Sequence, residues 1–199
     1  QPVSFSLWIK PATRYPRAVV FANSSSFDRP FSGYETLLEE GHVTWSLVRE
    51  FPGNAISITT VEEIPAKDWT HITVTSDGSR KAAGLKIYIN GSEAETRVVV
   101  DNLTRDYNIG SGLRLCGRGR EFGIPHGMID EVVVHTRAMT PWEVKAIHTN
   151  VGLGEVAATR EELRDYYFSA VDDEARKLAK MLNGARAAYR QEENQVREI

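Results

Sequence analysis

Apolar and polar residues alternate with a period of two through the first three quarters of the chain. The first such segment spans residues 3–10 and directs four apolar side chains to one face, namely Val3, Phe5, Leu7 and Ile9. The alternation returns over residues 85–89, and the Asn90-Gly91 pair that follows suits the two positive-φ positions of a type I′ hairpin. Turn-forming residues delimit about eleven short strands in all. Many short strands at this spacing predict two antiparallel sheets packed as a sandwich.

The last quarter of the chain has a different composition. All eight prolines and fourteen of the fifteen glycines precede Glu155. Residues 155–199 hold 18 charged side chains, 8 basic and 10 acidic. A turn-rich region followed by a charged region almost free of turn residues predicts a β-domain with a helical appendage. We place the β-sandwich at residues 1–154 and the appendage at residues 155–199.

Three helix starts are predicted towards the C-terminal end. Thr140 and Glu143 have the spacing of a capping box, and Thr159 and Glu162 repeat it. A longer helix is expected to begin at Asp172. Its apolar residues recur at alternating intervals of three and four, forming a seam of Ala175, Leu178, Leu182, Ala185 and Tyr189. We expect this seam to pack within an antiparallel helical pair that acts as a docking arm. The sandwich surface and another chain are the alternative partners of the seam.

Composition and charge disfavour several classes of protein. With 24 basic and 27 acidic side chains the net charge is −3, so no bulk attraction to nucleic-acid phosphate is expected. The longest apolar runs hold about five residues, whereas a membrane-spanning helix needs ~20, so no membrane span is predicted. The single cysteine, Cys116, excludes an internal disulfide, a four-cysteine zinc site and a Cys-x-x-Cys-His haem attachment.

Four sequence blocks occur in an order and spacing typical of one family. They are Trp69–Gly78, Leu85–Gly91, Gly127–Val132 and Arg137–Thr140. Together they resemble the laminin-G-like, concanavalin-A-like jelly-roll domains over roughly residues 1–150. The resemblance implies a mainly β fold, a two-sheet antiparallel jelly-roll sandwich, with the α-helical appendage added at its C-terminal side.

A narrower resemblance is carried by three further segments. These segments are similar to the version of this domain that is inserted in large planctomycete cytochrome-c-type proteins. They are Pro52–Ile56, Ser79–Lys86 and Asp101–Thr104. This resemblance implies a module of a secreted or periplasmic parent, hence an extracytoplasmic location. It implies no haem in this segment, because no attachment motif is present. The first residues show no signal peptide, so we expect an excised domain.

Glycoside hydrolysis is disfavoured by the arrangement of carboxylates. Hydrolases of this fold place their acid and nucleophile on one face of a strand, about 5 Å apart. Asp130 and Glu131 are adjacent, and adjacent strand residues point to opposite faces. The catalytic pattern Glu-x-Asp-x-x-Glu of such relatives is absent from the predicted strands. The sequence therefore predicts no enzyme.

A calcium ion is a possible cofactor, although none is required. Many jelly-roll relatives hold calcium through the acid at the position of Asp130, and six to eight oxygen ligands are needed. Asp28 or Asp77 can supply further oxygen ligands to the ion. The alternative is that Asp130 binds no metal and accepts hydrogen bonds from loop amides. No paired metal spacing supports a zinc site at the histidines, and His71 is interpreted as a packed sheet residue.

A glycine-rich loop at residues 117–123 is a candidate binding loop. It lacks the Gly-Lys-Ser/Thr ending of a phosphate-binding loop, and no helix follows it. Hydrogen-bond donors and a stacking surface are offered by Arg118, Arg120, Phe122 and His126. The alternative is a loop that only connects strands.

Aromatic rings that can stack on a sugar complete the candidate site. Tyr34 and Trp45 are the rings proposed for this role. Trp45 alternates with Val43 and Leu47, so a core position is the alternative for it. Trp69 matches a position that is usually buried in the resembling family.

The sequence as a whole favours a non-catalytic binding or interaction module with carbohydrate as its ligand class. Other domains of the parent protein are the alternative partners, and neither nucleic acid nor a membrane span is expected. A structural spacer without a small ligand is the alternative function. A glycoside hydrolase is a third and less favoured interpretation.

Overall fold

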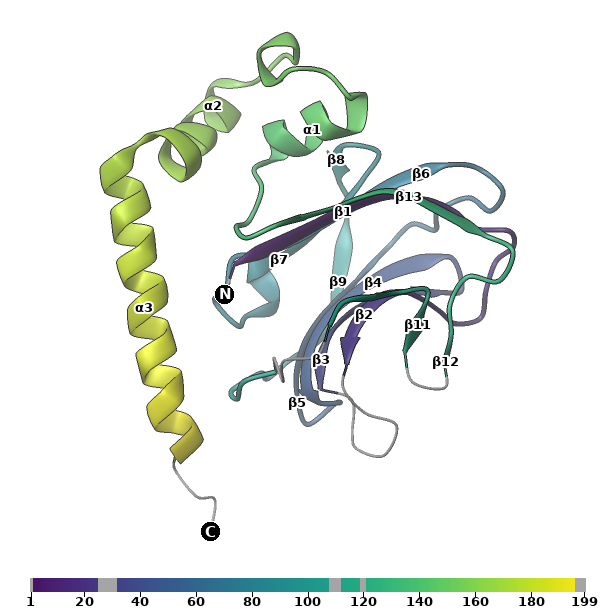
Figure 1. Ribbon diagram of the computed structural model, residues 1–199, viewed down its shortest axis with the longest axis horizontal. Helices are drawn as coiled ribbons and strands as arrows, with labels where there is room; N and C mark the ends of the chain where they lie inside the picture. The colour runs from purple at the N-terminus through teal and green to yellow at the C-terminus, as the bar shows by residue number, and fades with distance from the viewer. Residues whose placement is uncertain (1, 25–31, 108–111, 119–120, 196–199) are drawn as a thin grey trace.

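The computed structural model describes residues 2–24, 32–107, 112–118 and 121–195. Two antiparallel sheets lie face to face (Figure 1). The first has the order β13-β1-β6-β7-β8, with bounds Met128–His135, Val3–Lys10, Thr70–Ser76, Leu85–Ile89 and Ser92–Glu93. The second has the order β10-β2-β3-β4-β5-β9, with bounds Arg114–Leu115, Ala18–Ser24, Gly33–Glu39, His42–Glu50, Asn54–Thr60 and Thr96–Asp101. The predicted two-sheet antiparallel sandwich is confirmed.

Short elements complete the β-region. A two-stranded ribbon is formed by β11 (Gly117–Arg118) and β12 (Glu121–Phe122), and a 3-10 turn, η1 (Ala82–Gly84), precedes β7. In the turn between β7 and β8, Asn90 and Gly91 have φ values of 49° and 81°. Both angles lie in the left-handed region that a type I′ turn requires, so the predicted hairpin is confirmed.

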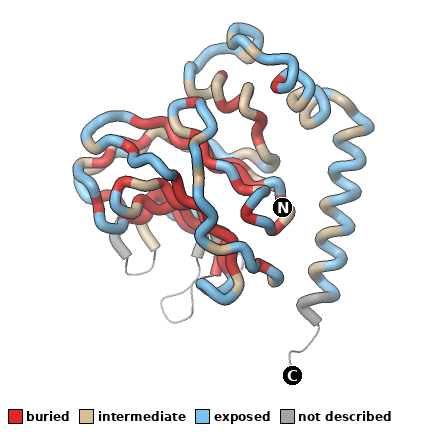
Figure 2. Tube along the Cα trace, turned by 180° about the vertical axis from the view of Figure 1, so that it is seen from behind, coloured by how far each residue is buried: buried red, intermediate tan, exposed pale blue. Residues whose placement is uncertain are grey.

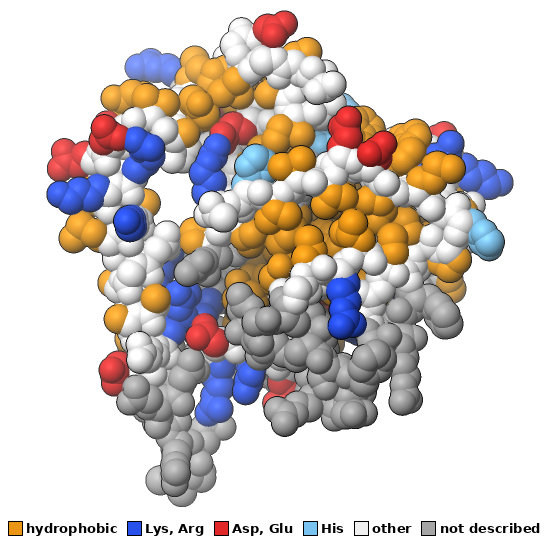
Figure 3. Space-filling view, in the orientation of Figure 1, with side chains coloured by type: hydrophobic (Ala, Val, Ile, Leu, Met, Phe, Trp, Pro, Cys, Tyr) orange, Lys and Arg blue, Asp and Glu red, His pale blue; other side chains and the backbone are white. Residues whose placement is uncertain are grey.

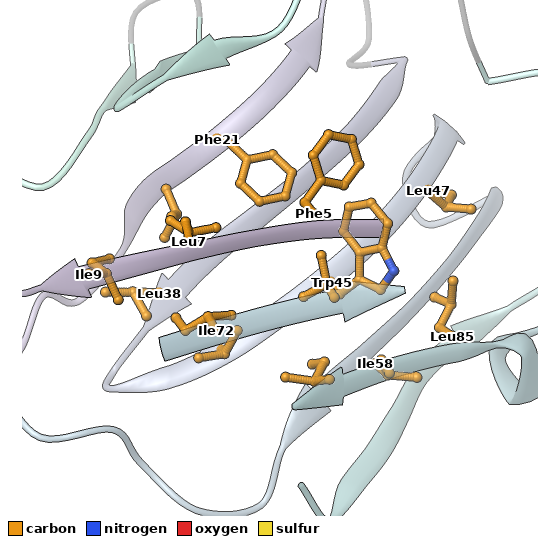
Figure 4. Close-up of a cluster of buried hydrophobic side chains, with 14 of the residues drawn as sticks. Phe5, Leu7, Ile9, Phe21, Leu38, Trp45, Leu47, Ile58, Ile72 and Leu85 are labelled. Carbon is orange, nitrogen blue, oxygen red and sulfur yellow. The ribbon is translucent and has the colours of Figure 1, made fainter. Parts of the chain in front are cut away.

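The hydrophobic core lies between the two sheets and is centred on aromatic side chains (Figure 4). Trp45 of β4 is 0% exposed, and its ring centroid lies 5.8 Å from that of Phe5 and 6.0 Å from that of Phe21. The indole nitrogen Nε1 donates to the carbonyl oxygen of Thr75 at 3.0 Å. Buried segments are concentrated in the sandwich, whereas the C-terminal helices are mostly exposed (Figure 2).

Helix α1 (Pro141–Thr149) is anchored to the sandwich through its first turn. The predicted capping box is confirmed, since Thr140 accepts from the amide of Glu143 and the Glu143 carboxylate accepts from the amide of Thr140. Arg137 forms an ion pair with the same carboxylate. Burial tends to raise the pKa of Glu143, but hydrogen bonds from Arg137 and Thr140 lower it below its usual value.

Helix α1 covers part of the outer face of the first sheet (Figure 1). Val144 of α1 packs with Met139 and with Tyr88 of β7 in a small apolar cluster that is separate from the main core. Burial raises the pKa of Tyr88. The outer face of this sheet is thus covered by a helix near β7.

The helical appendage contains four further elements. They are the 3-10 turn η2 (Leu153–Glu155), helix α2 (Arg160–Tyr166), the π-helical turn η3 (Tyr167–Val171) and helix α3 (Asp173–Gln195). The second predicted capping box, between Thr159 and Glu162, is confirmed. Helix α2 packs on α1 through an edge-to-face contact between Tyr166 and Trp142, with ring centroids 5.2 Å apart.

The predicted antiparallel pairing of the helices is wrong. Helix α3 does not fold back along α2 but runs beside the sandwich (Figure 1). Two seam residues, Leu178 and Leu182, are 59% and 52% exposed. The seven residues of α2 are too few to cover a seam of four turns, so most of this apolar stripe faces solvent. No helix within the described residues is long and apolar enough to span a membrane.

Candidate functional site

A groove of about 410 Å³ lies on the outer face of the second sheet. It forms because alternate residues of three neighbouring strands point away from the core and are polar. These outward residues include Glu35 and Glu39 of β3, Thr44 and Ser46 of β4, and Ser57 and Thr59 of β5. We call this hollow the polar groove.

The floor of the polar groove is a ladder of hydroxyl groups. The Oγ atoms of Ser46 and Ser57 lie 2.8 Å apart, and Thr44 Oγ1 donates to Thr59 Oγ1 at 3.0 Å. Each hydroxyl can donate once and accept twice, so these pairs still have acceptor capacity for a ligand. All four side chains are short, which leaves room above them.

Charged and aromatic side chains form the walls of the polar groove. Glu35 is buried and ion-paired with Arg118, which reaches it from the β11–β12 ribbon. Glu39 is paired with Arg17. Phe51, which directly follows β4, lines the groove and is 55% exposed. The groove thus combines hydroxyls, carboxylates, guanidinium groups and one accessible ring.

A second hollow, which we call the tryptophan pocket, lies on the outer face of the first sheet beside α1. It has a volume of about 380 Å³ and is lined by Trp8, Trp69, Asp130, Glu131, His148 and Asn150. Acidic and histidine side chains lie next to apolar ones where α1 meets the sandwich (Figure 3). The pocket differs from the polar groove in having tryptophan rings and no lysine or arginine in its described lining.

The tryptophan pocket corrects one argument made from the sequence. Asp130 and Glu131 were expected on opposite faces of β13, yet both line this pocket. A β-bulge between the Ser6 and Trp8 pairings inserts one extra residue into β13, and Glu131 has a φ of 50°. A bulge re-aims side chains, so the strict alternation of a regular strand does not apply here.

The sandwich that carries the polar groove has counterparts among known proteins. Residues 1–145 match the family described as the concanavalin A-like lectin/glucanases superfamily, which is well over half of the chain. The chain belongs to this superfamily. No curated protein matches it in sequence.

Solved structures that share the concanavalin A-like fold include binding domains of botulinum neurotoxins. The receptor-binding domain of botulinum neurotoxin D is 15% identical with a TM-score of 0.53, and the alignment covers 75% of this chain and 37% of that chain. The binding domain of botulinum neurotoxin DC in complex with rat synaptotagmin II is 14% identical with a TM-score of 0.52, covering 76% and 36%. This chain spans little more than a third of their length, and at such identity they show the shared fold.

Within this concanavalin A-like sandwich, the residues singled out in the sequence lie in different places. Arg118 lines the polar groove. His126 lies in an exposed turn with a φ of 61° and lines neither hollow. Arg120 and the side chain of Phe122 lie outside the described residues. The structure therefore places one of these four in the groove.

The aromatic residues proposed to stack on a ligand are oriented inwards. The prediction that Trp45 offers its ring is wrong, because the ring fills the core, and the alternative of a core position is confirmed. Tyr34 is half-buried and packs on Phe5 with ring centroids 5.0 Å apart. Trp69 differs from its expected burial, since it is 41% exposed in the tryptophan pocket.

Of the three acidic residues considered for calcium, the two that lie within the described residues are far apart. Asp130 pairs with Trp8, whereas Asp77 follows Ser76, which pairs with Val3 at the other end of β1. Five residues of strand separate these positions by roughly 17 Å. Asp130 Oδ1 accepts from the Glu131 amide at 2.8 Å, within β13. Asp28 lies outside the described residues, and within them no cluster of three metal-ligating side chains occurs.

Sequence reasoning missed most of the polar groove. A signal was available in two of its strands, because the serines and threonines of β4 and β5 alternate with apolar residues. In β3 the alternation is interrupted, since Thr36 is polar and Leu37 is apolar. Such alternation identifies an outward polar face of each strand. It does not tell which strands are neighbours, and the groove exists only because β3, β4 and β5 are adjacent.

Proposed function

We propose that this domain is a non-catalytic carbohydrate-binding module and that the polar groove is its binding site. The observation that carries the proposal is the ladder of paired hydroxyls flanked by the Glu35–Arg118 ion pair and the exposed ring of Phe51. Membership of a superfamily that includes lectins is consistent with it.

The chemistry of the polar groove suits a sugar. Sugars present neighbouring hydroxyl groups, which donate to carboxylates and accept from guanidinium groups, and Glu35 and Arg118 offer both in one place. The apolar face of a sugar ring can pack on Phe51. The groove has both signs of charge, so it provides no strong preference for a charged ligand over a neutral one.

Catalysis by the polar groove is disfavoured by its carboxylates. Glu35 and Glu39 are four residues apart on one strand, which corresponds to roughly 14 Å. Glycosidases need their two carboxyl groups about 5 to 9.5 Å apart. Each carboxylate is also paired with an arginine, so its oxygens are occupied by a guanidinium group rather than directed at a ligand.

The test is retention on polysaccharides. The purified domain should be retained by at least one polymer in a panel of β-glucan, xylan and agarose-type polysaccharides. It should also bind at least one sugar on a glycan array. Phe51→Ala and Glu35→Gln should each weaken that binding about tenfold, because each removes one contact worth roughly 1.4 kcal/mol. No polymer should be hydrolysed. Chelation with EDTA should leave retention unchanged, because we propose binding without a metal.

The matched control is Phe168→Ala, since Phe168 has a similarly exposed ring (51%) on η3, outside the polar groove. This variant should bind like the wild type. If no polymer is retained at millimolar concentration, the structural spacer becomes the better interpretation. If both groove variants bind as well as the control, the ligand lies elsewhere on the domain.

We further propose that the domain is one module of a longer extracytoplasmic protein of the planctomycete cytochrome-c type. The support is the similarity of three sequence segments, Pro52–Ile56, Ser79–Lys86 and Asp101–Thr104, to that version of the domain. Sequencing the flanking gene checks this proposal. Haem-attachment motifs on either side are expected, and their absence from both sides would contradict it.

A further inference from the structure

One wall of the tryptophan pocket, the ring of Trp8, is held in place by ring contacts. The ring centroid of Trp8 lies 5.2 Å from that of His71 and 5.4 Å from that of His148. Gly91 allows His148 to come this close, because a Cβ atom at Gly91 would lie 3.0 Å from the His148 ring. The tryptophan wall is therefore preorganised rather than a loose surface side chain.

The second ring of the pocket is open to solvent. Trp69 directly precedes β6 and is 41% exposed, although a tryptophan side chain has a large apolar area to bury. Trp8 lies between β6 and β13 in the first sheet and pairs with His71 on one side and Asp130 on the other. The register thus places a carboxylate next to the tryptophan rings.

The pocket carries two carboxylates and no positive charge. Neither Asp130 nor Glu131 takes part in an ion pair within the described residues, and no described lysine or arginine lines the pocket. Glu131 reaches it only because the bulge holds this non-glycine residue at a φ of 50°. Left-handed backbone of this kind costs energy and is concentrated at functional sites.

The two histidines near the pocket do not supply the missing charge at neutral pH. Burial lowers the pKa of His148. Burial, with repulsion from His148, lowers the pKa of His71 to about 4. Both rings are therefore mostly neutral at pH 7, and the field inside the pocket is that of two carboxylates.

From these contacts we propose that the tryptophan pocket binds a quaternary ammonium group. Such a cation is attracted to the faces of tryptophan rings and to carboxylates, and it has no hydrogen to donate, so it needs no directed acceptor. A volume of about 380 Å³ accommodates a trimethylammonium group together with part of the molecule that carries it. This function is separate from carbohydrate binding in the polar groove.

The experiment is a titration of the full chain with choline, followed by the chemical shift of the Trp69 indole N–H. The comparison ligand is 3,3-dimethylbutan-1-ol, which has the shape of choline but a carbon in place of the charged nitrogen. Choline should bind at least about tenfold more tightly than this neutral compound, since the cation–π and carboxylate attractions vanish without the charge.

Three variants test the residues assigned. Trp69→Ala and the double variant Asp130→Asn with Glu131→Gln should each weaken choline binding about tenfold. The amide substitutions keep the shape of the side chains and remove only their charge. Tyr167→Ala and Glu62→Gln are the matched controls, because both residues are exposed and outside the pocket. Binding to the variants is measured by calorimetry, which does not depend on the Trp69 signal.

Equal binding of choline and its neutral analogue would overturn the proposal, as would failure of choline to bind. Displacement of choline by a neutral oligosaccharide, taken from a polymer that retains the domain, would make the pocket a sugar site and would also overturn the proposal.

Phosphatidylcholine vesicles and a peptide with Nε-trimethyl-lysine distinguish two sources of the quaternary ammonium group. Stronger binding of either supports the proposal and identifies its source. The Trp69→Ala variant should still be retained on any polysaccharide that the wild type binds, because its polar groove is unchanged. Failure of choline binding can therefore be told apart from failure of carbohydrate binding.

Discussion

Replacing Trp45 with alanine should destabilise the sandwich by about 3–5 kcal/mol, the range found for large aromatic residues removed from a core. Trp45 is 0% exposed, contacts the rings of Phe5 and Phe21, and donates a hydrogen bond to the Thr75 carbonyl. The variant would therefore leave a cavity between the sheets and a buried acceptor without its donor. Since a domain has only about 5–15 kcal/mol of stability in total, much of the chain should be unfolded at 37 °C.

Urea denaturation followed by far-ultraviolet circular dichroism measures this loss. Trp69→Ala is the matched control, because it removes the same side chain from a position that is 41% exposed and should cost about 1 kcal/mol or less. Trp45→Phe separates the effect of the cavity from that of the lost hydrogen bond, since phenylalanine keeps most of the volume but has no N–H group. This variant should lose about 1–2 kcal/mol of stability. Equal losses for the alanine variants at positions 45 and 69 would refute the assignment of Trp45 as the centre of the core.

Acidification from pH 6.5 to pH 4 should remove on the order of 3 kcal/mol of stability through His71 alone. Its side chain is 1% exposed, its Nε2 lies 2.8 Å from Ser6 Oγ, and burial lowers its pKa to about 4. The unfolded chain takes up a proton near pH 6.5, whereas the folded chain takes it up only near pH 4. The folded state thus binds fewer protons in this window. The contribution is fully present above pH 6.5 and is lost as the pH falls through 4.

Free energies of unfolding measured at intervals between pH 7 and pH 4 test this prediction. His71→Gln should flatten the curve between pH 6.5 and 4.5, whatever its effect at pH 7. His126→Gln is the control for the substitution itself, because it makes the same replacement at a residue that is exposed in a turn. Carboxylates with lowered pKa values, such as Glu143, also lose their contribution to stability as the pH falls, at the acid end of the range. A slope that is the same in His71→Gln and the wild type would contradict the prediction.

Local patterns in the sequence determined the strands, the caps and the inward-facing residues. Alternation placed Phe5, Leu7 and Ile9 in the core, and all three are buried there. The two capping boxes start helices at the expected residues. These predictions succeed because side-chain periodicity and cap hydrogen bonds involve residues only two to four positions apart.

The candidate sites depend on contacts that such patterns do not contain. The polar groove needs β3, β4 and β5 to be neighbours, and Arg118 reaches Glu35 across 83 positions of the chain. The seam of α3 was read correctly as apolar, but the sequence did not tell that α2 is too short to cover it. Strand order and helix packing are set by long-range association, so they are decided only in the folded chain.

The sequence by itself determined a two-sheet sandwich with a charged helical appendage and no membrane-spanning run. Only the tertiary structure decided where the functional side chains meet. One extra residue in β13 directs the side chain of Glu131 towards the pocket that Asp130 also lines. Strict alternation would put these adjacent residues on opposite faces. Pairing with β1 creates that bulge, and it leaves no mark in the alternation of β13 considered alone.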